Sequence, residues 1–352
     1  MVVLATIDRF VRCVTTRTFQ LRHTTSRVLR FDLIAKICQI WQNGTCSMKI
    51  AVTGATGFLG RYVVQALTRQ QHACRCWYRP DRNGSGFESH SDYEEHAERS
   101  EWIPGRLGDV AATAALVTGC DAVVHAALMR CGPSFRGGEG DLVEFVQTNL
   151  LGTLQLIEAA QAASVSRFVF VSTCAVHERI LSDRPLDETH PLWPASHYGA
   201  HKAAIEKFVH SFGLGTNYPI CAVRPTGIYG LARPVEQSKW YDLVSRVAHG
   251  EDVTCEHGGK EVHAADVARA ISLLLLTDNI AGEVYNCYDM YVSEYDVAHI
   301  ARKLSGQEGT ISGERKQPRH QIETGKLRQL GMEFGGTPLL TATIQQIVNS
   351  VR

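Results

Sequence analysis

The stretch MKIAVTGATGFLG, residues 48–60, constrains the fold more than any other part of the sequence. The apolar run KIAVT is typical of a buried strand, and the residues that follow place Gly54, Gly57 and Gly60 directly before a helical pattern. Glycines at this spacing allow a tight turn, let the backbone approach a pyrophosphate, and let the helix pack on the strand. The helix N-terminus adds amide donors and the positive end of a dipole. The stretch therefore predicts a dinucleotide-binding loop.

The rest of the chain alternates short apolar runs with longer helical ones. Residues 73–78, 167–172 and 219–225 have the composition of strands, and residues 141–163 carry apolar positions at helical spacing. Strands that are apolar along most of their length, separated by helices, indicate a parallel sheet covered on both faces. We therefore predict an α/β fold built on a doubly wound parallel sheet of the Rossmann type.

The domain organisation follows from where this alternation weakens. We expect residues 48–230 to form the dinucleotide-binding Rossmann domain, with the polar stretch 81–100 as a surface excursion. Residues 231–352 are expected to form mainly a small C-terminal substrate-binding cap, and residues 263–287 to return to the Rossmann core.

Residues 1–47 differ in composition from the rest. They carry scattered arginines and many threonines, with Asp8 and Asp32 as their acids, which resembles an organellar presequence. Because Met48 opens a typical first strand, we favour a wrongly assigned start of translation. A presequence and a weakly ordered arm are the alternatives. In each case the segment is treated as a disordered extension outside the fold.

Composition gives no support for several classes of partner. The formal net charge of +0 gives no reason to expect nucleic acid or an anionic membrane surface as a partner. No apolar run approaches the roughly 20 residues of a membrane span. The eleven cysteines show no C-x-x-C spacing, which argues against a disulfide framework and a zinc site. We expect no metal site and a reducing, cytoplasmic location.

The stretch SHYGAHKAAIEKF, residues 196–208, places Tyr198 four residues before Lys202 at the start of a predicted helix. Residues with this separation are neighbours on a helix surface, so the pair alone is explained by two residues sharing one face. Other motifs in the chain decide between this explanation and catalysis.

Four further motifs follow one another along the chain: VVHAA at 123–127, VST at 171–173, RPTGIYG at 224–230 and HAADVA at 263–268. Together with the G-x-x-G-x-x-G loop and the Y-x-x-x-K pair, they closely resemble the extended short-chain dehydrogenase/reductase family. The resemblance is to its NAD-dependent epimerase/dehydratase branch in particular, and it covers nearly the whole chain from the glycine loop onward.

The resemblance implies roles for the reacting residues. Tyr198 would be the general acid/base that moves a proton at a substrate oxygen while hydride passes between the adjacent carbon and the nicotinamide. Lys202 would supply a charge that favours the phenolate and would hold the nicotinamide ribose. Thr173 would hydrogen-bond the reacting oxygen, with Ser172 as the neighbouring alternative and strand-end capping as the other explanation for both. His177 replaces a tyrosine of many relatives, so substrate contacts should differ.

The resemblance also implies which residues hold the cofactor. Asn149 would support the cofactor region from its helix, Asp109 would meet the adenine edge, and Pro225 would end its strand near the nicotinamide carboxamide. The predicted cofactor-binding residues are Gly54, Thr56, Gly57, Phe58, Leu59, Gly60, Arg79, Asp109, Ala126, Asn149, Tyr198, Lys202 and Pro225.

The end of the second predicted strand bears on the choice of cofactor. An NAD-specific fold usually offers an acid there for the ribose 2′-hydroxyl, whereas this sequence has Tyr78 and Arg79. Arginine can hold a 2′-phosphate with two hydrogen bonds. Asp81 could restore a preference for NAD if the loop turns back. We predict NADP, with NAD as the alternative.

Three functions remain open. The first is an NAD(P)-dependent oxidoreductase of the epimerase type that acts on a nucleotide-linked sugar with a tightly held cofactor. The second is an NADPH-dependent reductase of a small ketone or aldehyde, similar to dihydroflavonol reductases, which Arg79 and the short segment 229–261 favour. Cations in that segment, Arg233, Lys239 and Arg246, could instead pair with nucleotide phosphates.

The third function is a non-catalytic NAD(P)-binding sensor, which is disfavoured because the Tyr/Lys pair is present. Dehydration is disfavoured too, because Cys174 and Ala175 follow the threonine where a dehydratase usually carries an acid pair. Members of the family often form homodimers through a helix bundle, and the apolar stretches 150–160 and 203–212 are compatible with one.

Overall fold

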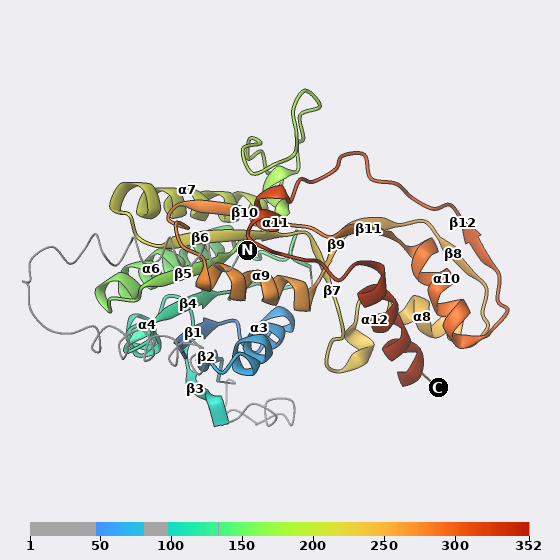
Figure 1. Cartoon of the computed structure of the whole chain (residues 1–352), viewed down its shortest axis with the longest axis horizontal. Helices are drawn as coiled ribbons and strands as arrows, with labels where there is room; N and C mark the ends of the chain where they lie inside the picture. Colours follow the sequence, from blue (N-terminus) through green and yellow to red (C-terminus); the bar gives the residue numbers. More distant parts are fainter. Residues whose placement is uncertain (1–46, 81–97, 133, 352) are drawn as a thin grey trace, which may run out of the picture. The chain divides into compact units, whose positions relative to one another are not determined.

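The computed structural model of the chain describes residues 47–80, 98–132 and 134–351 (Figure 1). The predictions made for residues 1–46, for Asp81 and for most of the polar excursion fall outside these described residues.

A parallel sheet of seven strands forms the centre of the described chain. Each strand pairs in parallel with its neighbours, in the order β10-β6-β5-β4-β1-β2-β3. The predicted doubly wound α/β fold is confirmed. The strands are β1 (Lys49–Thr53), β2 (Ala73–Tyr78), β3 (Ser100–Pro104), β4 (Ala122–His125), β5 (Arg167–Val171), β6 (Ile220–Pro225) and β10 (Glu283–Cys287).

Helices cover both faces of this sheet, because successive side chains of the central strands point to opposite sides. Ile50 and Val52 of β1 pack in the core cluster that holds the apolar faces of α3 (Phe58–Arg69) and α9 (Ala264–Leu276). Ala51, between them, packs in the cluster on the other face. That cluster receives side chains from α4 (Val110–Val117), α6 (Gly152–Ala162) and α7 (His197–Thr216).

The helical segment predicted over residues 141–163 is irregular at its centre. It runs as α5 (Leu142–Val146), a π-helical turn η2 (Gln147–Leu151) and α6. Such turns are rare and occur frequently at functional sites. Asn149 lies in this turn, and its side chain is buried.

The C-terminal part adds a second, smaller core. Val244, Val297 and Ile344 pack together there, each from a different helix. The helices are α8 (Tyr241–Ala248), α10 (Glu294–Ser305) and α12 (Gly336–Ser350), and the strands are β7 (Gly227–Tyr229), β8 (Val253–Cys255), β9 (Gly258–His263), β11 (Met290–Ser293) and β12 (Ile311–Gly313). Shorter pieces are η3 (Cys174–His177), η4 (Val235–Gln237) and α11 (Gly325–Gln329).

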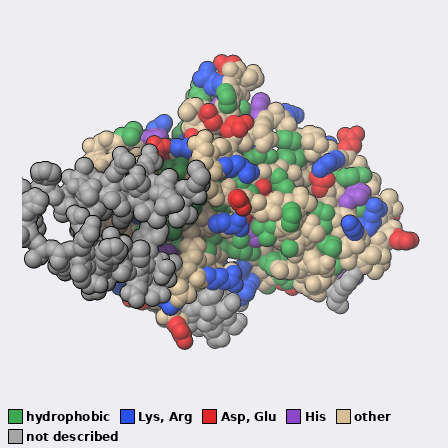
Figure 2. Space-filling model, in the orientation of Figure 1, with side chains coloured by type: hydrophobic (Ala, Val, Ile, Leu, Met, Phe, Trp, Pro, Cys, Tyr) green, Lys and Arg blue, Asp and Glu red, His purple; other side chains and the backbone are tan. Residues whose placement is uncertain are grey.

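Two surface observations agree with the composition. Positive and negative side chains are interspersed over the face drawn in Figure 2, as expected of a chain with a net charge of +0. Within the described ranges, the helices are all too short or too polar to cross a membrane.

Candidate active site

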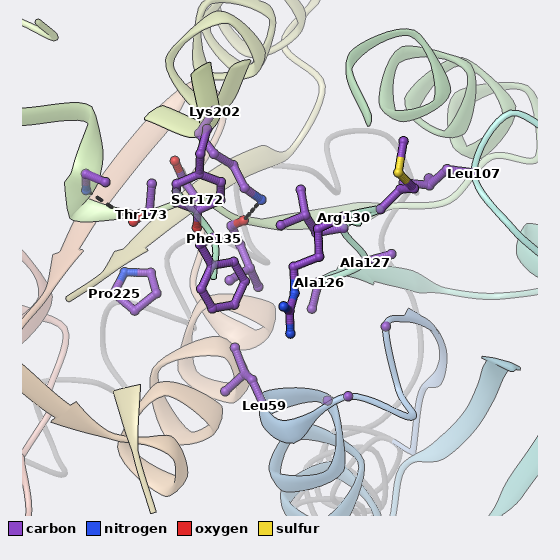
Figure 3. Close-up of a pocket in the computed structure, with 18 of the residues that line it drawn as sticks. Leu59, Leu107, Ala126, Ala127, Arg130, Phe135, Ser172, Thr173, Lys202 and Pro225 are labelled. Atoms are coloured by element: carbon purple, nitrogen blue, oxygen red, sulfur yellow. Dashed lines mark hydrogen bonds between the residues drawn. The ribbon is translucent and has the colours of Figure 1, made fainter. Parts of the chain in front are cut away.

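A large cavity opens where the strand order of the main sheet reverses, between β1 and β4 (Figure 3). Ligands of open α/β sheets bind outside the carboxyl ends of the strands at such a point. The cavity volume is about 2220 Å³. Pockets for single drug-sized ligands reach about 1,000 Å³, so this cavity has room for a dinucleotide and a second molecule.

The glycine loop forms one wall of the cavity by close backbone approach. Gly54 has φ +72°, and a Cβ on it would lie 2.7 Å from the backbone of Ala126. A Cβ on Gly60 would lie 2.0 Å from the carbonyl oxygen of Gly54. No side chain caps α3 at Gly57, and its first turn carries no acid. The loop therefore fits the predicted pyrophosphate site, with the unpaired amides of the first turn as donors.

Twelve of the thirteen predicted cofactor residues line this cavity, and Asn149 does not. The Asn149 Oδ1 atom accepts from the Met129 amide at 2.7 Å, and its Nδ2 atom donates to the Met129 carbonyl at 2.9 Å. Asn149 thus fixes the backbone of the segment after β4, which itself lines the cavity. The lining residues of the predicted set are Gly54, Thr56, Gly57, Phe58, Leu59, Gly60, Arg79, Asp109, Ala126, Tyr198, Lys202 and Pro225.

The end of the cavity near β2 and β3 carries Arg79, Arg106 and Asp109. The Asp109 Oδ1 atom accepts from the Ala112 amide at 2.9 Å, so the carboxylate also caps α4. Arg106, which follows β3, was not among the predicted residues. Its position beyond a strand end was the available signal. Two guanidinium groups therefore border the cavity at this end.

The two candidate hydroxyls after β5 differ in their surroundings. Ser172 donates to Glu206 at 2.5 Å, and Glu206 pairs with Arg224 at 2.6 Å in a fully buried ion pair. Thr173 lines the cavity, where it faces the Tyr198 hydroxyl, and its Oγ1 atom accepts from the Ala175 amide at 3.1 Å. Capping therefore accounts for part of the role of Thr173. Ser172 belongs to the buried network.

Lys202 is buried beneath the cavity, one helical turn from Tyr198. Its Nζ atom donates to the Val171 carbonyl at 2.7 Å and lies 4.5 Å from the centroid of the Phe170 ring. Burial lowers the pKa of Lys202 to about 7, against the opposing charge of Glu206. A lysine whose pKa lies near neutrality is typical of functional sites.

Tyr198 is held at the N-terminus of α7. Burial raises the pKa of its hydroxyl, and Thr173 and then Arg136 act in the opposite direction. In this structure the groups that lower the pKa are thus a hydroxyl and a guanidinium from outside α7. The activation by Lys202 that the resemblance implies stays a prediction.

The segment 129–140 is attached to this end of α7. Glu139 accepts from the Tyr198 amide at 3.1 Å, and Arg136 pairs with Glu178 at 2.9 Å. The ring centroid of Phe135 lies 5.4 Å from that of Tyr198, and Figure 3 shows the Phe135 ring projecting into the site. These contacts place the segment next to the tyrosine.

Beyond Tyr198 the cavity wall contains an apolar cluster formed by Cys174, Ile180, Leu186 and Ile322. Ile228, Lys260 and the polar residues His177, Glu178 and Thr226 also line the cavity. Ile322 was not predicted, because it lies in a segment without a motif. An isolated bridge to Leu186 brings it to the site.

The cations predicted as phosphate partners lie elsewhere. The described residues that line the cavity do not include Arg233, Lys239 or Arg246. Lys239 pairs with Glu261 at 2.5 Å, and Arg246 with Glu251 at 3.0 Å. The charges of Lys239 and Arg246 are therefore each compensated by a neighbouring carboxylate.

His177, the residue that departs from the family's tyrosine, also belongs to the buried network. Its Nε2 atom lies 3.1 Å from Nη1 of Arg224. Burial, with the adjacent guanidinium, lowers the pKa of His177 to about 4. A neutral imidazole thus replaces a phenol next to the cavity.

The model of the NAD dependent epimerase/dehydratase family matches residues 50–287. The chain belongs to this family. It is therefore an enzyme of the extended short-chain dehydrogenase/reductase type, as the motifs predicted.

Among curated relatives of this family member, the dTDP-D-glucose 4,6-dehydratase of Mus musculus is 28% identical over 269 residues, which is 74% of this chain and 73% of that protein. The match to the human protein of the same name spans 46% of each, about half its length. A 4-hydroxy-2-methyl-3-oxo-4-farnesyl-3,4-dihydroquinoline-1-oxide ketoreductase of Stigmatella aurantiaca is 30% identical over 290 residues, 73% of this chain and 80% of that protein.

The fold of this family member also matches solved structures. The UDP-glucuronic acid 4-epimerase from Bacillus cereus, in complex with UDP-glucuronic acid and NAD, superposes with a TM-score of 0.67 and 23% identity. That match covers 86% of this chain and 99% of the other. At this identity the likeness concerns the fold.

Proposed function

We propose that the chain is an NAD(P)-dependent oxidoreductase that transfers hydride at a carbinol or carbonyl carbon, with Tyr198 as the general acid/base. The observation that carries the proposal is that Thr173, Tyr198 and Lys202 line one cavity together with the glycine loop. A non-catalytic sensor would need the glycine loop to bind the dinucleotide but would not need Thr173, Tyr198 and Lys202 beside it.

The chain's own residues would handle the proton. Tyr198 would donate its hydroxyl proton to the carbonyl oxygen in reduction and take it back in oxidation. Thr173, which faces that hydroxyl, would hydrogen-bond the same oxygen. Lys202, on the buried face of α7, would stabilise the phenolate of Tyr198 through the positive charge of its ammonium group. A bound nicotinamide would supply or accept the hydride.

The apolar cluster beyond Tyr198 supports a small carbonyl substrate, that is, the reductase. Ile180, Leu186 and Ile322 offer no hydrogen bonds to a sugar, and Lys239 and Arg246 are paired outside the cavity. The relative from Stigmatella aurantiaca, which the match covers over most of its length, is a ketoreductase.

An epimerase of a nucleotide-linked sugar is the second candidate. The cavity volume of about 2220 Å³ would accommodate a sugar nucleotide beside the cofactor, and solved structures with this fold include UDP-sugar 4-epimerases. Dehydration is not favoured, although several relatives bear that name, because Cys174 and Ala175 follow Thr173.

NADP is the proposed cofactor, with NAD as the alternative. Arg79 and Arg106 border the cavity at the end of β2 and β3, where a 2′-phosphate would accept two hydrogen bonds from a guanidinium. Asn149 would contribute indirectly, by fixing the backbone of Met129.

The purified full chain tests this proposal directly. Mass spectrometry after denaturation identifies any dinucleotide that is released. A chain that arrives empty and binds NADPH much more tightly than NADH supports the reductase. Stoichiometric NAD would favour the epimerase, because that reaction recycles its cofactor in place. Retention of all turnover in Tyr198→Phe would contradict the proposed role of Tyr198 in both reactions. A wild-type chain that binds dinucleotide but turns over no substrate would leave the sensor.

A homodimer is proposed from the surfaces of the two helical segments that the sequence predicted for a dimer. Large apolar side chains stand exposed on α5 and η2, namely Leu142, Val143 and Leu151, and on α7, namely Phe208 and Leu214. Light scattering of the purified chain, alone and as Leu214→Lys, tests whether these faces join two copies. Leu214 does not line the described cavity.

A further inference from the structure

Lys260 stands apart from the other cations near the substrate end of the cavity. It lies in β9, lines the cavity and is half-buried. The next residue, Glu261, is buried and pairs with Lys239. Within the described parts of the chain, Lys260 takes part in no ion pair. Its charge is therefore available to a molecule in the cavity.

An apolar cluster lies next to Lys260. Burial lowers the pKa of Lys260, and the nearby Cys174 thiol acts in the opposite direction. Burial raises the pKa of that thiol to about 12, so the thiol is neutral and does not compensate the ammonium charge. Cys174 packs against the cluster of Leu186, Tyr288 and Ile322. An amine at the edge of such a cluster is partly desolvated, and an anionic partner compensates for that loss.

The second cation beside the tyrosine is already compensated. Arg136 pairs with Glu178 at 2.9 Å, and Glu178 also accepts from the Ser196 amide at 2.8 Å. The charge of Arg136 is thus used in attaching the segment 129–140 to the start of α7. Arg130, which also lines the cavity, donates to the Gly132 carbonyl and lies over the Phe135 ring. The Lys260 side chain, at this end of the described cavity wall, has no such ion pair, hydrogen bond or ring contact.

We propose that Lys260 binds a carboxylate of the substrate, and that the chain selects carbonyl compounds in which an apolar body links the carbonyl group to that carboxylate. The carbonyl would meet Tyr198 and Thr173, the body would pack on the cluster around Ile322, and the carboxylate would receive the ammonium group. A sugar nucleotide, with two phosphate charges and a polar body, suits this cluster poorly. The inference rests on the proposed function, from which it takes the reaction, and it adds the class of substrate.

Binding tests the proposal without any turnover. The probe is 4-phenylbutanoate, titrated by calorimetry into the full chain saturated with NADP. Lys260→Met, which keeps the length of the side chain and removes its charge, should weaken binding about 10- to 100-fold, as expected for a lost charge-assisted hydrogen bond. Lys260→Arg should retain most of the affinity. Lys303→Met, an exposed lysine in the last turn of α10, is the matched control and should leave it unchanged.

Turnover then separates this proposal from the proposed function. With NADPH, 4-oxo-4-phenylbutanoate should be reduced at least about 10-fold more efficiently than its methyl ester, and Lys260→Met should abolish that preference through KM. If 4-phenylbutanoate fails to bind, or binds equally to wild type and Lys260→Met, the carboxylate site is wrong. If binding depends on Lys260 but neither ketone is reduced, the site stands and the reductase function fails. If Lys260→Met weakens the binding of UDP-glucose but not that of 4-phenylbutanoate, Lys260 binds a phosphate, and the proposed carboxylate substrate is wrong.

Discussion

The two ends of the cavity are built in different ways. The nucleotide end is made by consecutive residues, from Gly54 to Gly60, whose backbone atoms form the wall. The substrate end is made by side chains from separate segments, with Cys174, Leu186, Lys260 and Ile322 as examples. A wall of backbone depends on local spacing, whereas a wall of side chains depends on how distant segments pack.

This difference explains what each end can tolerate. At the nucleotide end a single methyl group collides with main-chain atoms, which cannot move aside without changing the turn. At the substrate end a changed side chain alters shape and polarity and leaves the strands in place. Loops on a fixed scaffold are where binding specificity usually varies. Variants at each end, and at the junction between them, should therefore fail in different measurements.

Tyr198→Phe, at the junction, should have the largest effect. Removal of the hydroxyl takes away the proton donor and should lower turnover of any carbonyl substrate about 10²- to 10⁴-fold, whereas dinucleotide affinity should stay within a few-fold. Steady-state kinetics and NADPH fluorescence measure the two quantities. Tyr241→Phe on α8, outside the cavity wall, is the matched control. If Tyr198→Phe lost dinucleotide affinity by as large a factor as it lost turnover, Tyr198 would do more than transfer the proton.

Lys202→Met should reveal the buried charge beneath the junction. The pKa of Lys202 is lowered to about 7, well below that of a lysine in the unfolded chain. Between about pH 7 and 10 the unfolded chain therefore holds a proton that the folded chain has released, so the free energy of unfolding rises with pH. Without added dinucleotide, the wild type should gain about 3 kcal/mol over Lys202→Met between pH 6.5 and 9.5.

Urea unfolding of both proteins across that pH range measures this gain. The comparison cancels the other titrating groups, because both proteins share them. A constant difference between the two would mean that Lys202 keeps its proton throughout.

Gly60→Ala should affect the nucleotide end. The new Cβ would lie 2.0 Å from the Gly54 carbonyl oxygen, so the turn must shift, at a cost of about 1–3 kcal/mol. We expect dinucleotide affinity to fall about 10- to 100-fold. Gly215→Ala in α7 is the control and should leave affinity unchanged, because its added Cβ would meet nothing within 4 Å beyond its own helical backbone. Equal affinity in both variants would show that the loop does not hold the pyrophosphate.

The same difference decided how much could be predicted from the sequence. Strand KIAVT and the three glycines act over a short span, so their local spacing predicted the glycine loop, and the alternation of apolar and helical runs predicted the fold. Residues farther along the nucleotide end, such as Asp109 and Pro225, were predicted from the resemblance to the family. The predicted helix over residues 141–163 hid a π-helical turn at Asn149, because its apolar spacing does not show how the backbone hydrogen bonds shift. The buried amide of Asn149, which is bonded to Met129, was visible in the sequence as a polar residue in an otherwise apolar helical stretch.

The substrate end was beyond prediction for physical reasons. Lys239 and Arg246 were considered as phosphate partners because they are cations in the right segment, but Glu261 and Glu251 pair with them. Which lysine finds a carboxylate depends on packing between strands, which spacing does not encode. Ile322 reaches the cavity through a single bridge to Leu186, a contact between residues far apart in the chain.

Ile322→Val, at the substrate end, should have the smallest effect. Ile322 is 6% exposed and packs in the cluster with Leu186 and Tyr288, so loss of one methyl group should cost about 1 kcal/mol of apolar contact. Ile322 also lines the cavity, so a substrate that packs on this cluster would lose part of the contact. We therefore expect KM for 4-oxo-4-phenylbutanoate to rise about 3- to 10-fold at an unchanged kcat. Ile311→Val on β12, which does not line the described cavity, is the matched control. The dinucleotide affinity of both should equal that of wild type, because the nucleotide end is held by backbone that neither change touches. A fall in that affinity on Ile322→Val would show that the two ends are coupled, and the division of the cavity would have to be abandoned.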